Sequence, residues 1–253
     1  MDMTTPFDLS GQTAIVTGAN TGIGQAIALS LAAAGADIAA VGRTPAQETV
    51  EKVRALGRQA QIVSADLSSI EPVQRVVDET LEKLGRLDIL VNNAGIIRRA
   101  DSVDFTEEDW DAVIDTNLKT TFFLCQAAGR HMLAQGAGKI INIASLLSFQ
   151  GGIRVPSYTA SKSGVAGLTK LLANEWAARG VNVNAIAPGY IATNNTAALQ
   201  ADETRNRQIQ ERIPAGRWGD PGDIGGAAVF LASSAAAYIH GHTLAVDGGW
   251  LAR

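Results

Sequence analysis

A doubly wound α/β fold is predicted by three features of the 253-residue sequence. Short apolar runs alternate with amphipathic stretches along the chain, which is the pattern of βαβ units in a parallel sheet. Glycine-containing turns separate many of these stretches, and no linker, internal repeat or low-complexity tract divides the chain. We therefore predict a single domain over residues 1–253, with a Rossmann-type parallel sheet of about seven strands and helices on both faces.

The strands are predicted where short apolar runs are bounded by turn residues. In chain order they are Thr13–Thr17, Asp37–Val41, Gln61–Ser64, Asp88–Val91, Lys139–Ala144, Asn182–Ile186 and Thr243–Val246. Each run is short enough for a strand that is buried inside a sheet.

Helices are predicted in the amphipathic or alanine-rich stretches between the strands. In chain order they are Gly22–Ala34, Pro45–Leu56, Ile70–Leu84, Thr106–Ala134, Ser157–Ala178 and Asp220–Leu231. Two starts carry local signals, because Pro45 suits a first helical turn and Thr106 with Asp109 resembles a capping arrangement. The polar segment 194–217 interrupts the alternation, and we expect a substrate lid there, although its charges also fit a solvated helix face.

Composition excludes several classes of function. The net charge of −4 and the pI near 5.4 argue against a general nucleic-acid binder, which would carry a basic face. The only cysteine, Cys125, lies in an apolar run, so we predict a buried small hydrophobe and a reducing compartment. The three histidines, His131, His240 and His242, are scattered, so no metal site is predicted.

No segment predicts export or membrane insertion. The first ten residues contain Asp2 and Asp8 and lack an apolar secretion segment. Ala26–Ala36 is apolar but too short to cross a bilayer. We therefore expect a cytoplasmic protein with no membrane partner.

A glycine turn directly follows the first predicted strand and opens the first helix. Its spacing is Gly-x3-Gly-x-Gly, with Gly18, Gly22 and Gly24. Such a turn lets the backbone approach a pyrophosphate, which then accepts hydrogen bonds from free N–H groups at the helix start. Glycine turns also occur without ligands, but this position favours a dinucleotide site. We expect it to be formed by Gly18, Asn20, Thr21, Gly22, Ile23 and Gly24.

The end of the second strand should meet the adenine ribose, where an acidic residue favours NAD and an arginine can pair with the 2′-phosphate of NADP. The chain reads Val41-Gly42-Arg43 there, without an acid. We predict that Arg43 contacts the cofactor, which leaves NAD and NADP both open.

Tyr158 and Lys162 are four residues apart and therefore share one face of a helix. A free tyrosine loses its proton near pH 10, but a nearby ammonium and a cationic nicotinamide ring both favour the phenolate. Tyr158 could then exchange a proton with a substrate alcohol or carbonyl, and Ser145 is placed to hydrogen-bond the same oxygen. Such a pair also occurs by chance on helix surfaces.

The surrounding motifs resemble the short-chain dehydrogenase/reductase family over essentially the whole chain. They are TGANTGIG (17–24), NNAG (92–95), Asn117, Ser145, YTASK (158–162) and PG (188–189), in the family's order and spacing. The resemblance implies a catalytic tetrad of Asn117, Ser145, Tyr158 and Lys162, in which Asn117 holds a water that connects Lys162 to solvent.

The resemblance also implies further cofactor contacts. They would come from Asp66, Leu67, Asn93, Ala94, Gly95, Tyr158, Lys162, Pro188, Gly189, Ile191 and Thr193. Asp66 and Leu67 would touch the adenine, while Ile191 and Thr193 would lie near the carboxamide. A homotetramer is implied as well, with Trp250 and Leu251 at an interface.

Five segments resemble the branch of this family that oxidises 2-dehydro-3-deoxy-D-gluconate reversibly to 3-deoxy-D-glycero-2,5-hexodiulosonate. They are residues 90–99, 141–162, 184–196, 212–219 and 245–253. This resemblance implies a deoxy keto sugar acid as substrate, a role in the breakdown of pectin-type uronates, and NAD as the usual cofactor. Arg43 departs from a simple NAD pattern and keeps NADP open.

Three arginines flank the segments that should frame such a site: Arg98, Arg99 and Arg154. An arginine can bind a carboxylate through two charge-assisted hydrogen bonds, although each could equally be a solvated loop charge. We prefer Arg154, which lies four residues before Tyr158. The expected substrate-binding set is Ser145, Gln150, Arg154, Tyr158 and Arg99.

Two alternatives remain at this point. One is another reductase of the same family, acting with NADPH on 3-ketoacyl groups or on 5-ketogluconate. The other is a protein that senses dinucleotides without catalysis. A sensor has no chemical need for the complete set of Asn117, Ser145, Tyr158 and Lys162, which argues against it.

Overall fold

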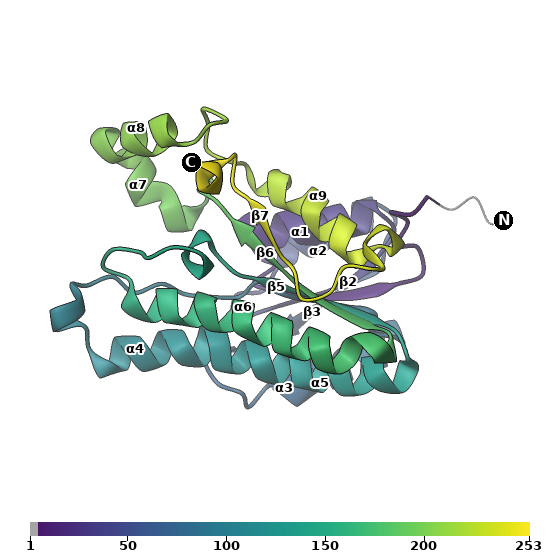
Figure 1. The fold of residues 1–253 in the computed structure, drawn as a ribbon. Coiled ribbons are helices and arrows are strands. Elements are labelled where there is room, and N and C mark those ends of the chain that lie inside the picture. The colour runs from purple at the N-terminus through teal and green to yellow at the C-terminus, as the bar shows by residue number, and fades with distance from the viewer. Residues whose placement is uncertain (1–4) are drawn as a thin grey trace.

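The structure is a computed structural model that describes residues 5–253, and it confirms the predicted fold class. Its parallel sheet has the order β3-β2-β1-β4-β5-β6-β7 (Figure 1). The strands are β1 (Thr13–Thr17), β2 (Asp37–Gly42), β3 (Ala60–Ser64), β4 (Ile89–Asn92), β5 (Gly138–Ile143), β6 (Val181–Pro188) and β7 (Thr243–Val246). The order reverses direction between β1 and β4, and ligands of such sheets bind at the carboxyl ends of the strands beside this point.

Helices cover both faces of the sheet, as predicted. They are α1 (Gly22–Ala33), α2 (Gln47–Ala55), α3 (Val73–Leu84), α4 (Glu107–Ile114), α5 (Thr120–Gln135), α6 (Pro156–Trp176), α7 (Ala197–Ala201), α8 (Glu203–Arg212) and α9 (Pro221–Ala232). Figure 1 shows α1, α2 and α9 on one face and α3 to α6 on the other. The short helices α7 and α8 lie apart from both layers, next to the chain's C-terminus.

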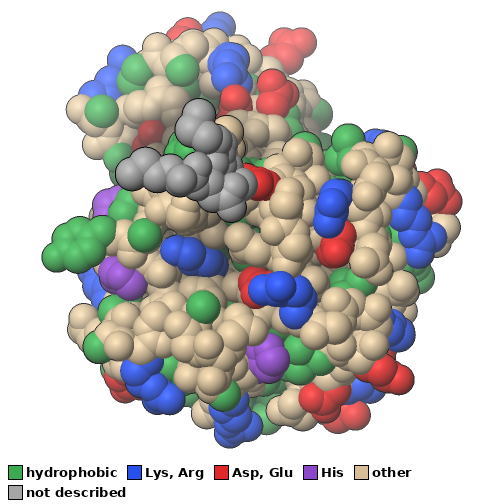
Figure 2. Space-filling view, turned by 90° about the vertical axis from the view of Figure 1, so that its right-hand side faces the viewer, with side chains coloured by type: hydrophobic (Ala, Val, Ile, Leu, Met, Phe, Trp, Pro, Cys, Tyr) green, Lys and Arg blue, Asp and Glu red, His purple; other side chains and the backbone are tan. Residues whose placement is uncertain are grey.

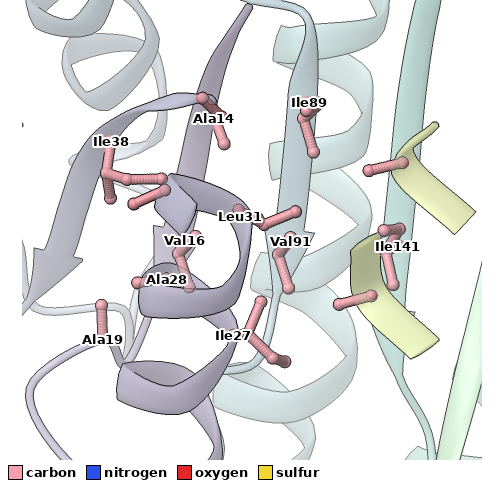
Figure 3. Close-up of a cluster of buried hydrophobic side chains, with 14 of the residues drawn as sticks. Ala14, Val16, Ala19, Ile27, Ala28, Leu31, Ile38, Ile89, Val91 and Ile141 are labelled. Atoms are coloured by element: carbon pink, nitrogen blue, oxygen red, sulfur yellow. The ribbon is translucent and has the colours of Figure 1, made fainter. Parts of the chain in front are cut away.

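One face of α1 forms the centre of the core on its side of the sheet (Figure 3). Ile27 and Leu31 are one helical turn apart, are fully buried, and pack with Val16 of β1 and Val91 of β4. Burying a side chain of this size contributes about 1.5–3 kcal/mol. This packing fixes the start of α1 against the carboxyl end of β1.

Two buried asparagines connect the middle of the sheet to the opposite helix layer. Asn92 of β4 and Asn142 of β5 are directly paired, and Asn92 Nδ2 donates to Asn142 Oδ1 at 2.9 Å. Asn142 Nδ2 donates in turn to Thr169 Oγ1 of α6 at 3.0 Å. Cys125, also buried, accepts from Asn92 Nδ2 at 3.2 Å, and burial raises the pKa of its thiol to about 12. The prediction of a buried, unreactive cysteine agrees with this environment.

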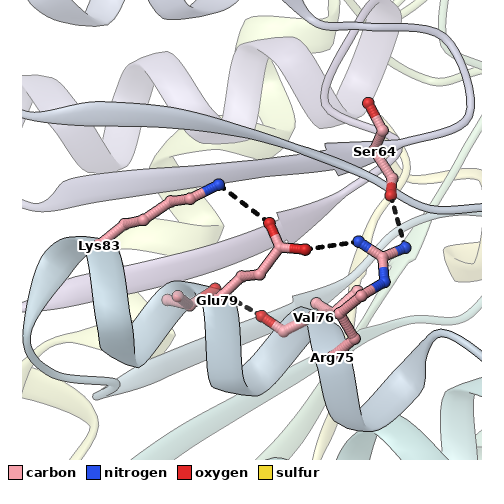
Figure 4. Close-up of polar contacts among 6 residues, drawn as sticks. Ser64, Arg75, Val76, Glu79 and Lys83 are labelled. Atoms are coloured by element: carbon pink, nitrogen blue, oxygen red, sulfur yellow. Dashed lines mark hydrogen bonds and ion pairs between the residues drawn. The ribbon is translucent and has the colours of Figure 1, made fainter.

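The outer side of α3 carries a small set of polar contacts (Figure 4). Glu79 accepts from Arg75 at 2.6 Å and from Lys83 at 2.9 Å, and the hydrogen bond from Arg75 is the main reason that the pKa of Glu79 is lowered. Arg75 also donates to the carbonyl of Ser64 at the end of β3. Exposed pairs of this kind contribute about 0.2–1 kcal/mol each, so they orient α3 more than they stabilise it.

The structure corrects three helix boundaries. Helix α2 begins at Gln47 rather than Pro45, because Ala46 has a non-helical backbone. Helix α3 begins at Val73 rather than Ile70, since Pro72 disfavours helical geometry in the residue before it. The predicted helix 106–134 consists of α4, a π-helical turn over Asp115–Lys119, and α5. The cap at its start is present, since Thr106 Oγ1 accepts from Asp109 N at 3.2 Å.

Within residues 5–253, no helix is long and apolar enough to cross a membrane, and no cluster of three or more candidate ligands could hold a metal ion. On the face in Figure 2, acidic and basic side chains are interspersed rather than gathered by sign. Asp2, part of the predicted non-secretory N-terminus, lies outside the described residues.

Candidate active site

A cleft of about 970 Å³ opens at the carboxyl ends of the central strands. It is lined by the β1–α1 turn, the segments after β4, β5 and β6, the start of α6, and one side of α8. Tyr158, Lys162 and Ser145 all line it. The sheet therefore brings the predicted glycine turn and the predicted proton-transfer residues into one site.

The glycine turn is shaped for close approach by a ligand. Gly18 and Gly22 have left-handed backbones, with φ of +64° and +58°. A Cβ on Gly24 would collide with the Gly18 carbonyl. The residue before α1, Thr21, makes no side-chain cap, so the first N–H groups of the helix remain available to an anion. This cradle fits the pyrophosphate of a dinucleotide.

Asn93 holds the cradle in place. Its Nδ2 donates to the carbonyl of Thr17 at 2.9 Å and to that of Gly18 at 3.3 Å. Its backbone N–H donates to Thr17 Oγ1 at 2.9 Å. The NNAG motif thus ties the end of β4 to the turn after β1.

Tyr158 and Lys162 lie one turn apart on α6. The Lys162 ammonium is 5.6 Å from the centre of the Tyr158 ring. Lys162 is 4% exposed, and its Nζ donates to the carbonyl of Ile143 at 2.6 Å. Burial lowers the pKa of Lys162 to about 8, so at neutral pH it still carries most of its charge.

The environment of the Tyr158 phenol differs in part from the prediction. Burial is the largest influence and raises the pKa of Tyr158, whereas a hydrogen bond with Ser145 and the guanidinium of Arg99 lower it. Arg99 is thus a further cation that acts on the phenol, besides the Lys162 ammonium 5.6 Å from the ring centre. A half-buried phenol with a raised pKa keeps its proton and is suited to donate it.

Asn117 lies in the π-helical turn between α4 and α5, behind the cleft wall. Its amide holds the backbone of Ile96 on both sides: Oδ1 accepts from Ile96 N at 2.8 Å, and Nδ2 donates to Ile96 O at 2.9 Å. A Cβ at Gly95 would lie 3.1 Å from Asn117 Oδ1 and 3.8 Å from Lys162 Nζ. Asn117 and Lys162 thus both lie close to Gly95.

The flanking arginines separate into two groups. Arg99 lines the cleft, whereas Arg98 is ion-paired with Asp109 at 3.0 Å. Arg154, the preferred carboxylate ligand, is not among the residues that line the cleft. Its backbone has a φ of +65°, and its guanidinium pairs with Asp101 at 2.9 Å. The structure therefore does not support a substrate-binding role for Arg154.

Most of the expected cofactor residues line the cleft. Besides Tyr158 and Lys162 they are Gly18, Asn20, Thr21, Gly22, Ile23, Gly24, Arg43, Asn93, Ala94, Gly95, Pro188, Gly189 and Thr193. Three do not. Leu67 and Ile191 are buried in the hydrophobic core, and Asp66 accepts from the backbone of Ser68. Arg43 lies 4.0 Å from Asp66 and is largely exposed.

One wall of the cleft was missed by sequence reasoning. It consists of Arg205, Gln208, Ile209 and Arg212 of α8 together with Trp250. The α8 residues follow helical spacing, so their periodicity could have indicated a common face. Gln150, which was expected to bind substrate, also lines the cleft and accepts from Trp250 Nε1 at 3.3 Å. Trp250 is 4% exposed within this chain, and the neighbouring Leu251 is half-buried.

Comparisons with known proteins find a matching family model and relatives over nearly the whole chain. The family model described as enoyl-(acyl carrier protein) reductase matches residues 18–251. The 2-dehydro-3-deoxy-D-gluconate 5-dehydrogenase of Escherichia coli is 59% identical over 248 residues, which cover 98% of each chain.

Two solved structures cover nearly all of the chain. The crystal structure of a putative 2-deoxy-D-gluconate 3-dehydrogenase from Agrobacterium tumefaciens with bound NADP is 61% identical, with a TM-score of 0.92, over 99% of this chain and 100% of that one. A gluconate 5-dehydrogenase from Burkholderia cenocepacia, in complex with NADP and tartrate, is 40% identical, with a TM-score of 0.93, over 98% of each chain.

Proposed function

The chain belongs to the short-chain dehydrogenase/reductase family and is a nicotinamide-dependent oxidoreductase acting on CH–OH groups, and we propose that its substrate is 2-dehydro-3-deoxy-D-gluconate. The reaction would interconvert this sugar acid and 3-deoxy-D-glycero-2,5-hexodiulosonate. The observation that carries the proposal is the 59% identity, over 98% of both chains, with a relative of that name. Arginines in the cleft are consistent with an anionic substrate.

Tyr158 would exchange the proton with the reacting oxygen. In the direction of reduction, the phenol donates its proton to the carbonyl oxygen, and Ser145 hydrogen-bonds the same oxygen. In oxidation, the phenolate removes the proton of the substrate hydroxyl. A bound nicotinamide ring supplies or accepts the hydride.

Lys162 and Asn117 would assist this proton transfer indirectly. The charged Lys162 favours the phenolate form in oxidation, because opposite charges at short range stabilise each other. Asn117 positions Gly95 and Ile96, which line the cleft beside Lys162.

The glycine cradle and Arg43 would bind the cofactor. We propose that Arg43 allows NADP(H) to be used besides NAD(H), because its exposed guanidinium lies on the cleft at the end of β2. An ammonium or guanidinium can neutralise a 2′-phosphate at that position. Two similar structures with NADP support this assignment.

We also propose that the protein is a cytoplasmic homotetramer that takes part in uronate breakdown. The tetramer and the role in uronate breakdown rest on the family resemblance, whereas the location rests on the sequence features described above. Sedimentation of the purified protein tests the tetramer directly, and a monomer at micromolar concentration would refute it.

The test of the proposed function is a steady-state panel with purified protein. NADH and NADPH would each be combined with 3-deoxy-D-glycero-2,5-hexodiulosonate, 5-ketogluconate and a 3-ketoacyl thioester. We expect the highest kcat/KM for the deoxy diketo acid. A preference for the thioester would favour a 3-ketoacyl reductase instead, and an absence of turnover with all three would refute the proposal.

A further inference from the structure

Three arginines face the cleft without a carboxylate partner. Arg99, Arg205 and Arg212 line it, and none of them forms an ion pair with another residue of the described range 5–253. The flanking Arg98 and Arg154, in contrast, are both occupied by aspartates. An unpaired guanidinium in a cleft attracts an anionic ligand.

Arg212 is the most firmly oriented of the three. It is the last residue of α8, and its guanidinium carbon lies 4.0 Å from the centre of the Trp250 ring. Trp250 is buried and donates through Nε1 to Gln150 Oε1. A guanidinium stacked on an aromatic face keeps its N–H edge free for a planar, two-point contact with a carboxylate.

The same tryptophan ties Arg212 to the reacting end of the cleft. Trp250 belongs to a buried cluster with Leu146, which directly follows Ser145. Trp250 also contacts Tyr190, with ring centres 4.6 Å apart. Tyr190 directly follows Gly189, one of the expected cofactor residues that line the cleft. Through Trp250, Arg212 is therefore connected to the segments that follow β5 and β6 in the same cleft.

Substrate geometry distinguishes Arg212 from Arg99. In the proposed substrate pair, the reacting carbon C5 and the carboxylate at C1 are separated by the three carbons between them. Arg99 acts on the Tyr158 phenol, so it belongs near the reacting carbonyl. The carboxylate must lie farther from the phenol, and Arg212 offers a cation on α8, a different wall of the cleft from α6, which carries Tyr158.

We propose that Arg212, positioned by Trp250, binds the carboxylate of the sugar-acid substrate and selects anionic over neutral substrates. This inference rests on the proposed function. The proposal assigns the preference for acids to α8 and to the C-terminal turn that carries Trp250. The two segments are also joined by a hydrogen bond from the Arg253 guanidinium to the carbonyl of Glu211.

The test uses Arg212→Met, which keeps an apolar stem over the Trp250 ring but removes the charge. Reduction of the diketo acid would be compared with reduction of its neutral methyl ester. We expect kcat/KM for the acid to fall about tenfold to a hundredfold, mostly through KM, as for a lost hydrogen bond to a charged group. The value for the ester should stay within about twofold, given that its neutral group gains little from the guanidinium.

Arg207→Met is the matched control. Arg207 lies on the same helix, is largely exposed, pairs with Glu211 at 3.9 Å and does not line the cleft. Its substitution should leave both substrates unchanged. Arg212→Lys keeps the charge but lacks the planar guanidinium, so we expect an intermediate fall in kcat/KM for the acid. If the Met variant does not fold, the Lys variant tests the proposal.

An unchanged acid-to-ester ratio in Arg212→Met, or in Arg212→Lys if only that variant folds, would overturn the inference. A rise confined to the KM of NADPH would overturn it too, because Arg212 would then bind the cofactor phosphates. Wild-type protein that reduces neither the acid nor the ester would refute the proposed function instead. The two failures are therefore distinguishable.

Discussion

Lys162 is buried beside the phenol that it is expected to assist. Because burial disfavours the ammonium, the pKa of Lys162 falls from 10.5 to about 8 in the folded protein. The carbonyl of Ile143 compensates in part by accepting a hydrogen bond from Nζ. The folded state therefore carries a charge that the unfolded chain would solvate more easily.

This cost makes a prediction about pH and stability. Below about pH 8 Lys162 is protonated in both states, and the folded state bears the full cost of the buried charge. Between about pH 8 and 10.5 the unfolded chain binds more protons, so the contribution of Lys162 to the free energy of unfolding becomes more favourable as pH rises.

Lys162→Met should remove that dependence. The free energy of unfolding of the variant minus that of wild type should decrease from pH 7 to pH 10. The limiting slope is about 1.4 kcal/mol per pH unit, the value for one proton. Urea titrations at four or five pH values measure it. A constant difference across this range would contradict the lowered pKa.

Tyr158→Phe tests the proton-transfer role. Removing the hydroxyl should lower kcat by about a hundredfold or more, the usual contribution of a general acid or base, while NADPH binding measured by fluorescence stays the same. Tyr238→Phe serves as control, because Tyr238 is 99% exposed and does not line the cleft. Intact turnover in Tyr158→Phe would exclude the proposed mechanism.

Local spacing predicted part of the site but not the contacts between distant segments. Tyr158 and Lys162 are one helical turn apart, so their proximity follows from the sequence once α6 is assumed. Arg154 is equally near Tyr158 in sequence, yet its left-handed backbone and the carboxylate of Asp101 hold it elsewhere. Arg212 meets Trp250 only through tertiary packing, which no local pattern encodes.

At the scale of elements, the start of α1 shows how steric limits shape the cofactor site. Gly24 lies so close to the Gly18 carbonyl that any side chain forces the turn to shift. The strand positions and the parallel order were predictable because buried strands have short apolar runs. The starts of the helices were harder to predict. The backbone geometry at Pro72 and at Ala46 determines where α3 and α2 begin, and the apolar pattern does not encode it.

Gly24→Ala should therefore weaken cofactor binding and destabilise the fold by about 1–3 kcal/mol, as overpacking generally does. Gly167→Ala is the matched helical control. Gly167 lies on the exposed side of α6 with no atom near its would-be Cβ, so stability should rise by about 0.5–1 kcal/mol. Calorimetry and NADPH titration measure both variants, and equal behaviour of the two would disprove the steric argument.

For the whole molecule, a single domain predicts one unfolding transition. Trp176 packs in the core on the α5–α6 side, whereas Trp218 and Trp250 lie in the cluster around α8. If these regions form one cooperative unit, tryptophan fluorescence and far-UV circular dichroism should give the same urea midpoint. Separate midpoints, assigned with Trp176→Phe and Trp218→Phe, would show that the α7–α8 region unfolds independently.

The buried amide pair in the middle of the sheet also fixes the alignment of two strands. Asn92 and Asn142 can meet only when β4 and β5 are in their present register, and a slip by one residue would leave polar groups unsatisfied in an apolar layer. Asn93 directly follows one strand and Ser145 lies just beyond the other. The distance between Asn93 and Ser145 thus depends on a buried contact that lines neither the cofactor site nor the substrate site. A substitution such as Asn142→Leu is therefore expected to misalign the two residues from within the core.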